Sequence, residues 1–427
     1  MTSAQGDGPL ITRGRHRASQ AGLGGRFWSL YLGTAVSLLG NYVAYLTVPL
    51  LVLQIVGTVE SAVPFSITYA LETVPTLVFG LAGGALLDRI QLRWAMIVSD
   101  IARASAFFYL AVSLNEVGIT TIYAASFLIG SFSAVYENAL YALIPSLVPE
   151  ERLAQTNGWI SATQAAMFAA GPLIAGVIAT AAGPAPGLWL NGSTFVLSAI
   201  GVFLVGPVPS PGIKEERRGF IEETLNGLRF LVGERRLRDS TITAAAANLV
   251  LGFVEATFVV MATIVLGTTT DTQIGLLITF FGAGMFSGAA MADRVIRILG
   301  LGRTMMLGLM TMGLGMGMLV FSRFGVLALA FAFVMFVGIG LVNVPIATIR
   351  QVYTPPAMLG RVITASRALS WGTLPIGAIV GGLLADQVNY RPIVRATPLV
   401  LLILAGWLVT TPLWSDTFGP THHRRRA

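Results

Sequence analysis

The sequence predicts an all-α integral membrane protein with twelve transmembrane helices in two six-helix halves. Hydrophobic residues make up 55% of the 427 residues and charged residues only 11%, whereas soluble domains carry about 25% charged residues. So little charge cannot cover a solvated surface. Uncharged runs of about twenty residues are long enough to span a bilayer as helices, and the chain consists mostly of such runs.

Twelve of these runs follow one another along the chain, and a long interruption occurs only after the sixth. They cover residues 28–55, 62–84, 95–114, 119–146, 158–182, 187–207, 241–266, 272–292, 304–321, 326–346, 363–385 and 394–413. The first run is too long and too uniformly apolar for a cleaved signal segment, so we expect it to remain as a helix.

The runs and the interruption divide the chain into five segments. These are a disordered cytoplasmic N-terminus (1–26), an N-terminal half (27–207), a cytoplasmic linker (208–240), a C-terminal half (241–413) and a basic C-terminal tail (414–427). Apolar residues between Phe220 and Val232 recur at helical spacing. They predict a short helix that lies on the inner membrane surface and ties the halves together.

The distribution of basic residues predicts the orientation in the membrane. With the N-terminus inside, 23 of the 27 Lys and Arg residues fall on the inner side, and only Arg323, Arg391 and Arg395 fall on the outer side. Basic residues are retained in the cytoplasm. We therefore expect both termini in the cytoplasm, and the net charge of +7 reflects topology and does not indicate a nucleic-acid partner.

Several kinds of chemistry are excluded by missing residue types. The chain has no cysteine, its three histidines lie in the tails, and Lys214 is the only lysine. No Gly-rich phosphate loop precedes that lysine, so ATP hydrolysis by such a loop is excluded. We expect no metal site, no cofactor and no enzymatic activity; transport against a gradient would need an ion gradient or another subunit.

A charged hook ends two of the apolar runs. In GALLDRIQLR, Asp88 follows the second run; in AAMADRVIR, Asp293 follows the eighth run, 205 positions later. Pro172 and Pro375, in the fifth and eleventh runs, are 203 positions apart. An internal repeat of six helices explains both offsets, and transporters built from such repeats carry the substrate site between them.

Four motifs carry a resemblance to a known family. GALLDRIQLR, NGWISATQAAMFAAGPLIAG, TPPAMLGRV and SLLGN resemble motifs of the major facilitator superfamily, in its branch of drug and siderophore exporters that includes the enterobactin exporter and the macrolide-efflux proteins. The resemblance covers residues 26–413. It places on the gate motif Gly84, Asp88, Arg89 and Arg93, and on the antiporter motif Gly158, Gly171, Pro172 and Gly176. It also implies a working monomer.

The hook itself has a physical interpretation. A carboxylate at the end of one helix can meet the N–H groups of a neighbouring helix N-terminus, which lack partners. Gly84 allows that neighbour to approach closely. The resemblance identifies the neighbour as helix eleven, which begins near Arg361, and implies a latch on the cytoplasmic side. The alternative is that Asp88 and Arg89 only anchor a helix end among the lipid headgroups.

Charged residues inside the spans are costly. A carboxylate near mid-membrane costs about 2.5–3.5 kcal/mol on insertion scales, so it marks function or a buried partner. With no histidine in the spans, Glu137 and Glu255 are the expected proton carriers. Glu72 is a third candidate, and its alternative role is a hydrogen bond to another helix. Asp100 and Arg103, one turn apart, are expected to form a structural ion pair.

The resemblance implies that helices one, four, seven and ten line a central cavity. The sequence places polar residues near mid-depth of these helices, namely Asn41, Glu137, Asn248, Glu255 and Asn343. The expected aromatic wall residues are Tyr42, Tyr45, Tyr136, Phe253 and Phe258. Aromatic faces with few fixed polar contacts suit a pocket of loose specificity.

These observations predict a proton-coupled secondary transporter that exports small amphipathic compounds from the cell membrane by alternating access, as in drug or antibiotic efflux. A dedicated exporter of siderophores or of self-made metabolites fits the same features. An importer or facilitator on the same fold is disfavoured by the antiporter motif GPLIAG. A membrane enzyme lacks the residues it needs, and a scaffold leaves the embedded carboxylates unexplained.

Overall fold

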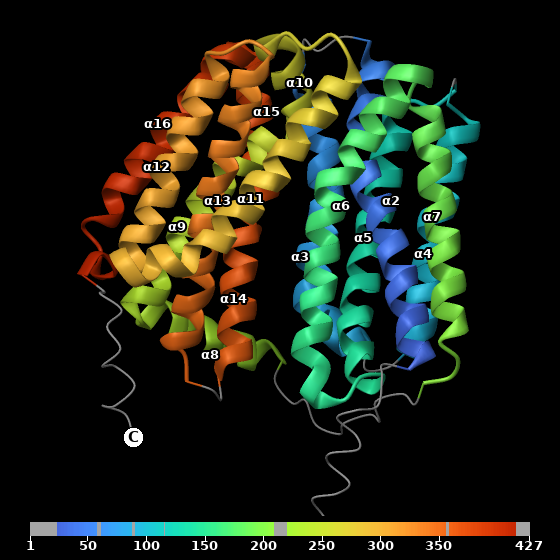
Figure 1. The fold of residues 1–427 in the computed structure, drawn as a ribbon, viewed down its shortest axis with the longest axis horizontal. Coiled ribbons are helices and arrows are strands. Elements are labelled where there is room, and N and C mark those ends of the chain that lie inside the picture. Colours follow the sequence, from blue (N-terminus) through green and yellow to red (C-terminus); the bar gives the residue numbers. More distant parts are fainter. Residues whose placement is uncertain are drawn as a thin grey trace, which may run out of the picture.

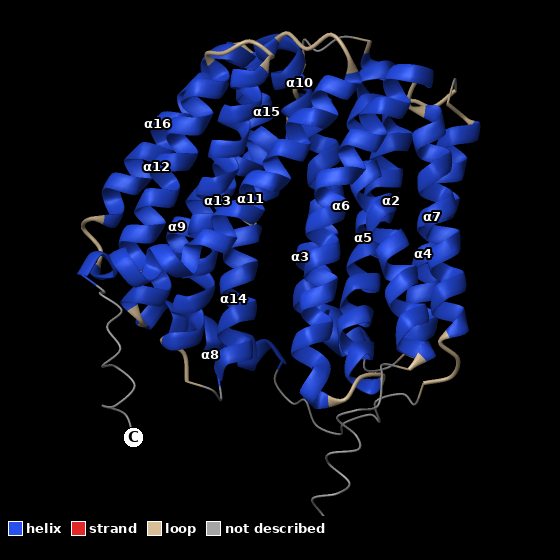
Figure 2. Ribbon diagram, in the orientation of Figure 1, coloured by secondary structure: helices blue, strands red, loops and turns tan. Residues whose placement is uncertain are grey.

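The computed structural model describes residues 24–57, 61–87, 90–114, 116–208, 220–355 and 358–415. Within these residues every regular element is a helix, as Figure 2 shows. The expected disordered N-terminus and basic C-terminal tail lie almost entirely outside them, as does the first part of the linker.

The helices follow the order of the expected spans. Those before the linker are α2 (Gly25–Val56), α3 (Val63–Leu87), α4 (Leu92–Val112), α5 (Ile119–Leu143), α6 (Leu153–Ala182) and α7 (Ala185–Leu204), with the short turns η1 (Ile144–Ser146) and η2 (Glu150–Arg152) between α5 and α6. Those after α8 (Phe220–Gly233) are α9 (Arg235–Ala256), α10 (Phe258–Val260), η3 (Met261–Leu266), α11 (Asp271–Leu299), α12 (Leu301–Val320), α13 (Val326–Val352), α14 (Leu359–Trp371), α15 (Thr373–Val388), α16 (Tyr390–Leu408) and η5 (Pro412–Ser415).

Ten spans in the described chain are long and apolar enough to cross a membrane, and α14 with α15 counts as one of them. The α9–α10–η3 unit is an eleventh, bent by 63°. The helix α3, whose segment Val63–Phe79 is apolar, stands at the place of the second expected span. Each of the twelve expected spans thus corresponds to a helix or a broken helix. The all-α membrane fold is confirmed.

The helices form two groups that stand side by side. In Figure 1, α2 to α7 lie on one side and α9 to α16 on the other, while α8 lies below α14. The groups touch where α6 packs against α11 and where α3 packs against α15. Close approach there and within each group depends on small residues; a Cβ at Gly288 of α11, for example, would collide with the Val337 carbonyl of α13.

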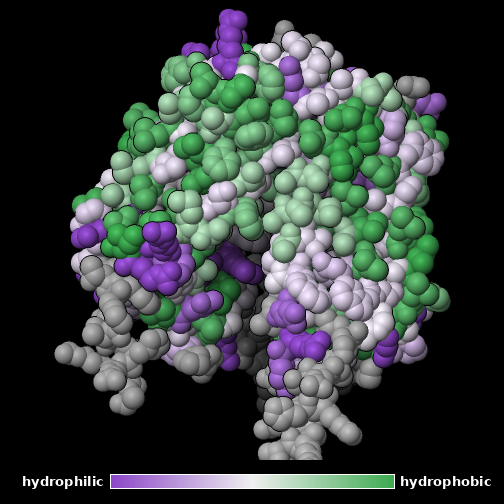
Figure 3. Space-filling view, in the orientation of Figure 1, coloured by the Kyte–Doolittle hydropathy of each residue, from purple (hydrophilic) through white to green (hydrophobic). Residues whose placement is uncertain are grey.

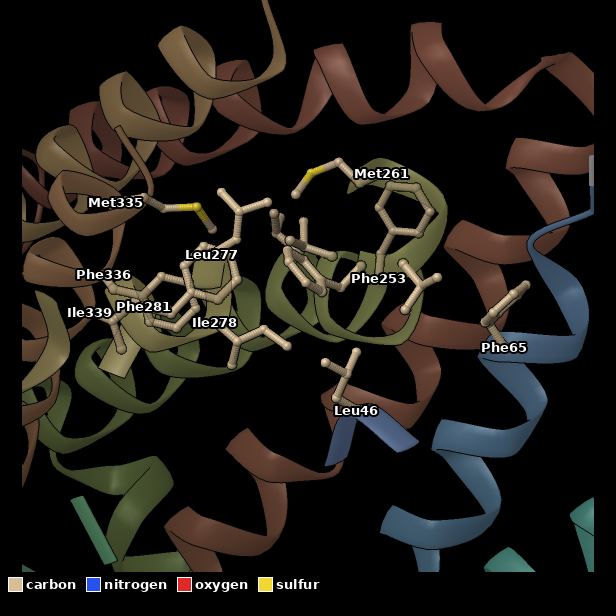
Figure 4. Close-up of a cluster of buried hydrophobic side chains, with 14 of the residues drawn as sticks. Leu46, Phe65, Phe253, Met261, Leu277, Ile278, Phe281, Met335, Phe336 and Ile339 are labelled. Atoms are coloured by element: carbon tan, nitrogen blue, oxygen red, sulfur yellow. The ribbon is translucent and has the colours of Figure 1, made fainter. Parts of the chain in front are cut away.

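A hydrophobic cluster joins the two groups at one end. Figure 4 shows Leu46 of α2 and Phe65 of α3 on the side of Phe253 and Met261, with Phe281 farther away beside Phe336; all belong to one cluster. The Phe281 and Phe336 rings stack with centroids 4.1 Å apart. Both rings belong to the second group, so this stacking packs α11 against α13 on that side of the cluster.

Two expected spans are broken where the sequence predicted continuous helices. The seventh was expected over 241–266, but it begins at Arg235 and bends at Thr257. There the Thr257 hydroxyl donates to the Phe253 carbonyl at 2.7 Å, a back-bond that bends helices. The eleventh, expected over 363–385, is divided at Gly372, because Pro375 offers no N–H to the preceding turn.

Arginines fasten helix ends near the membrane surface. The Arg26 Nε donates to the Val205 carbonyl at 2.6 Å, and the Arg93 guanidinium donates to the Phe203 carbonyl at 2.7 Å. Both carbonyls belong to the end of α7, where the last C=O groups of a helix lack partners within it. These contacts position α2 and α4 against α7.

Candidate functional site

A cleft runs between the two helix groups. Figure 3 shows it as a hollow that opens toward the end at which α8 lies, with hydrophilic residues beside it. We call this the open end. Along the described part of the cleft lie a cavity of about 260 Å³ on the α2–α7 side, one of about 210 Å³ on the α9–α16 side, and one of about 40 Å³ between the groups.

The cavity of about 260 Å³ collects most of the residues expected on the N-terminal wall. Asn41, Tyr42 and Tyr45 of α2 line it together with Tyr136 and Glu137 of α5. Helices one and four therefore border the cleft. The Glu137 side chain is exposed in the cleft, where a carboxylate can exchange a proton or meet a cationic group.

Glu72 of α3 joins two of the cavities. It lines both the cavity of about 260 Å³ and that of about 40 Å³, and its side chain is exposed. Among the hydrogen bonds within the described chain, none involves its carboxylate. The alternative role as a hydrogen-bond partner of another helix is therefore not seen here, and the carboxylate faces open space.

Asp100 and Arg103 of α4 form a fully buried ion pair, with 2.5 Å between Asp100 Oδ1 and an Arg103 nitrogen. The guanidinium also donates to Asn41 Oδ1 and to the Ser133 hydroxyl, each at 3.3 Å. It lies over the Tyr136 ring, 4.7 Å from its centroid. The expected pair is present and extends to the cavity wall.

Glu255 lies at the bend of the seventh span and bridges the groups. The Tyr69 hydroxyl of α3 donates to Glu255 Oε2 at 2.7 Å. Both residues line the cavity of about 40 Å³, with Tyr45 and Glu72. A hydrogen bond to a carboxylate depends on that carboxylate's charge, so the strength of this bridge depends on whether Glu255 is protonated.

The cavity of about 210 Å³ is lined by α9, α12, α13 and α14. It includes the expected residues Asn248 and Asn343, and the Asn248 amide donates to the Ser370 carbonyl at 2.8 Å. Arg350 and Arg367 line it as well. Arg367 acts electrostatically on Glu137, which belongs to the opposite wall.

Two of the expected wall residues do not line any of these cavities. Phe253 and Phe258 are buried, with 4% and 5% of their surface exposed. The Phe253 ring packs against Tyr390, 5.7 Å between centroids, and the Phe258 ring meets Phe281 edge-on at 5.0 Å. Phe253 precedes the bend at Thr257 and Phe258 follows it, and both rings lie in the hydrophobic cluster. In this structure neither ring faces a cavity, and their expected contact with substrate stays a prediction.

The other end of the cleft is closed by hydrogen bonds between the groups. At this closed end the Ser61 hydroxyl and the Ala62 N–H donate to the Asp386 carboxylate at 2.5 and 2.7 Å. These donors stand at the start of α3, and Asp386 stands near the end of α15. Nearby, the Thr272 N–H of α11 donates to the Thr180 hydroxyl of α6 at 2.9 Å.

The residues of the antiporter motif lie on α6, against neighbouring helices. A Cβ at Gly176 would collide with the Asp271 carbonyl of α11, and one at Gly171 would collide with Tyr42 of α2. A Cβ at Gly275 of α11 would likewise collide with the Pro172 carbonyl. Gly158 differs, since a Cβ there would meet nothing within 4 Å. Three of the four positions therefore stand at contacts where space is restricted.

The gate motif is only partly described. Asp88 and Arg89 lie outside the described residues, and Gly84 lies within the last turn of α3. Arg93 donates hydrogen bonds to the end of α7. These bonds do not reach the eleventh expected span, which corresponds to α14 with α15. The Arg361 backbone packs against Gly227 of α8. In the second hook, Asp293 pairs with Arg297 of its own helix at 2.6 Å.

Replacing Asp386 by Ala should loosen the closed end. Hydrogen bonds to a charged group contribute about 1.5–3 kcal/mol. The equilibrium between the closed and open conformations of this end should therefore shift toward the open one by about tenfold or more. Because the chain has no cysteine, a single cysteine at Thr68, beside Glu72 in the smallest cavity, reports access. We expect a membrane-impermeant maleimide to label it about tenfold faster from the closed-end side.

Asp293→Ala is the matched control, because its carboxylate pairs only along α11. Equal labelling rates in Asp386→Ala and in the parent would show that Asp386 does not hold the closed end.

Sequence reasoning missed several residues of this site. Tyr69, Arg350, Arg367 and Asp386 were not singled out, although Arg350 and Arg367 were counted as inner-side charges. An arginine within one or two turns of a span's end has two possible surroundings, the headgroups or the cleft. Only the helix arrangement decides between them.

The comparisons with known proteins agree with this architecture. The Major Facilitator Superfamily matches residues 30–367. The chain is 25% identical over 386 residues to the multidrug efflux pump Tap of Mycolicibacterium fortuitum, covering 87% of this chain and 92% of that protein. It is 24% identical over 389 residues to macrolide efflux protein A of Streptococcus pyogenes, covering 85% and 90%.

Solved structures show the same fold. The nucleoside transporter NupG superposes with a TM-score of 0.71 at 11% identity, covering 91% of this chain and 99% of that one. A bacterial homologue of the iron transporter ferroportin superposes with a TM-score of 0.69 at 18% identity, covering 90% of this chain and 97% of that one. The family match spans most of a chain whose helices enclose a central cleft. The chain therefore belongs to the major facilitator superfamily of membrane transporters, and its relatives include drug exporters.

Proposed function

We propose that this transporter exports small amphipathic compounds across the cell membrane in exchange for protons. Alternating access would carry the compound from the open end to the closed end, with both termini and α8 on the cytoplasmic side. The charge distribution along the sequence supports this orientation, and the similarity to two efflux proteins supports the direction. The two six-helix halves, 27–207 and 241–413, would move against each other in a monomer.

The observation that carries the proposal is the bridge between Tyr69 and Glu255. It joins the groups through a carboxylate, at 2.7 Å, beside a second carboxylate, Glu72. Removing the negative charge from Glu255 weakens a charge-assisted hydrogen bond that roughly doubles in strength when the acceptor is ionised. Loading and release of a proton at this site would thus favour different arrangements of the groups.

Glu137 supplies a second proton site in the same proposal. It is exposed in the cleft and lines the cavity of about 260 Å³, whereas Glu255 lines that of about 40 Å³. Aromatic rings that suit an amphipathic compound lie around it. A compound with a cationic group and a proton would compete for this carboxylate. Such competition is the physical basis of exchange, because only one of the two occupies the site at a time.

The test uses inside-out vesicles with an imposed proton gradient, reported by a quenched pH-sensitive dye. Amphipathic cations, macrolides, tetracyclines and siderophores are added one at a time. With a transported compound, we expect the parent to dissipate the gradient and the double variant Glu137→Gln/Glu255→Gln to leave it intact. Glu116→Gln, at an exposed glutamate outside the cavities, is the matched control.

Proton-coupled export by the double variant would overturn the coupling. If cells that produce the protein accumulate more of the compound than cells that lack it, the protein is an importer. If only a siderophore or a host metabolite dissipates the gradient, the protein is a dedicated exporter of that compound.

A further inference from the structure

The cavity of about 210 Å³ holds a guanidinium with unused hydrogen-bonding capacity. Arg350 of α13 lines this cavity and donates to the Ser370 hydroxyl at 3.3 Å. Its Nε is buried and has no hydrogen-bond partner among the described residues. A guanidinium carries five N–H donors, and a buried donor without an acceptor is costly. This group is arranged to receive an acceptor from outside the protein chain.

A second arginine stands beside the first. Arg367 of α14 lines the same cavity, and the two positive charges repel each other. The Arg367 guanidinium lies over the Trp371 ring, 5.6 Å from its centroid. Neither arginine takes part in an ion pair within the described chain. Like charges in a partly dry cleft raise each other's energy, and a bound anion would relieve that repulsion.

We propose that Arg350 and Arg367 form a subsite for the acidic group of the amphipathic substrate. The planar fork of a guanidinium matches the geometry of carboxylate, sulfonate and phosphate groups, and the Asn343 amide in the same cavity offers a neutral hydrogen-bond donor. This inference rests on the proposed function in taking the cleft as the transport site, and it adds one oxyanion to the description of the substrate.

The opposite wall limits how that substrate lies. Glu137 attracts Arg367 across the cleft, so an anion at the subsite competes with Glu137 for the same cation. The carboxylates of Glu72 and Glu137 repel a second acidic group. The acidic group of the compound therefore binds on the α9–α16 side, while its apolar or cationic remainder lies toward Tyr42 and Tyr45.

Binding of two matched probes tests the subsite directly. The probes are 11-(dansylamino)undecanoic acid and its methyl ester, whose fluorescence rises in apolar surroundings. The full-length protein is held in nanodiscs of neutral lipid, and empty nanodiscs give the partition background. We expect the acid to bind about tenfold more tightly than the ester, as one net charge-assisted contact predicts.

The variants separate charge recognition from packing. Arg350→Gln and Arg367→Gln should each weaken binding of the acid about tenfold and leave the ester unchanged. Arg350→Lys keeps the charge and loses the planar fork of the guanidinium. Its affinity for the acid should lie between those of Arg350→Gln and the parent. Glu137→Gln should strengthen binding of the acid, because it frees Arg367. The matched control is Arg395→Gln. Arg395 is an exposed arginine of α16 that packs over the Phe321 ring, which follows α12.

Equal affinity of the parent for acid and ester would overturn the subsite. The subsite would also be overturned if the two Gln variants lost affinity for the acid and the ester equally, since that result indicates damage to packing. These binding measurements need no proton gradient. If proton-coupled export fails, the proposed function is wrong and the binding measurements still test the subsite. If export is normal but shows no preference for the acidic form of a compound, the subsite is wrong and the proposed function stands.

Discussion

Replacing Asp100 by Asn should destabilise the protein by about 3–5 kcal/mol, the cost of leaving one partner of a buried ion pair uncompensated. Asp100 and Arg103 have 0% and 1% of their side-chain surface exposed. After the substitution, the Arg103 charge stays inside the helix bundle. Its remaining polar partners are all neutral: the Ser99 carbonyl and the side chains of Asn41, Ser37 and Ser133. Unfolding of the purified protein in mixed micelles, followed by tryptophan fluorescence, measures the change.

Two further variants identify the cause. Asp100→Asn combined with Arg103→Met removes both charges and should recover most of the lost stability, because replacing a whole buried pair is often neutral. Asp293→Asn breaks the pair with Arg297, whose side chains are 73% and 72% exposed, and should cost less than about 1 kcal/mol. If Asp100→Asn costs no more than Asp293→Asn, the buried pair does not stabilise the fold.

Glu255→Gln should abolish the coupling of export to protons while leaving the bridge to Tyr69 in place. The Gln carbonyl still accepts a hydrogen bond from the Tyr69 hydroxyl, but it carries no titratable proton. In the vesicle assay, the variant should leave the proton gradient intact when substrate is added. Accumulated substrate should still move down its own gradient through the variant.

Tyr69→Phe is the complementary change. It keeps the Glu255 carboxylate and removes the bridge, at 2.7 Å, that joins α3 to α9. Proton coupling should persist, whereas the cysteine at position 68 should be labelled about tenfold faster from the closed-end side, as loss of a hydrogen bond to a charged group predicts. Loss of proton coupling in Tyr69→Phe as well would assign Glu255 a bridging role in place of a proton-carrying one.

The embedded carboxylates show how far local sequence can lead. Glu72, Glu137 and Glu255 were recognisable because a carboxylate in an apolar run is costly wherever the helix stands. The three do reach the cleft. Their partners were not recognisable, because Tyr69 and Glu255 are 186 positions apart and only the packing of α3 near α9 brings them together.

The aromatic residues show where sequence reasoning fails. Tyr42, Tyr45 and Tyr136 line the cavity as expected, but Phe253 and Phe258 do not. A straight seventh helix would have kept Phe258 on the face that the spacing predicts. The back-bond of Thr257 and its contact with the Tyr390 hydroxyl, 3.0 Å away, bend the helix and redirect the segment from Phe258 onward. Phe253 lies before the bend, and its ring packs against Tyr390 of α16.

The sequence by itself determined the class of protein, the order of the spans and the residue types available for chemistry. Hydrophobic length and charge content act locally, so they can be read without knowing which helices are neighbours. The tertiary structure decided which end of the cleft is closed, which arginines face it and which carboxylate bridges the two groups. Those properties depend on contacts between residues far apart in the chain, such as Ser61 with Asp386, and no local pattern encodes them.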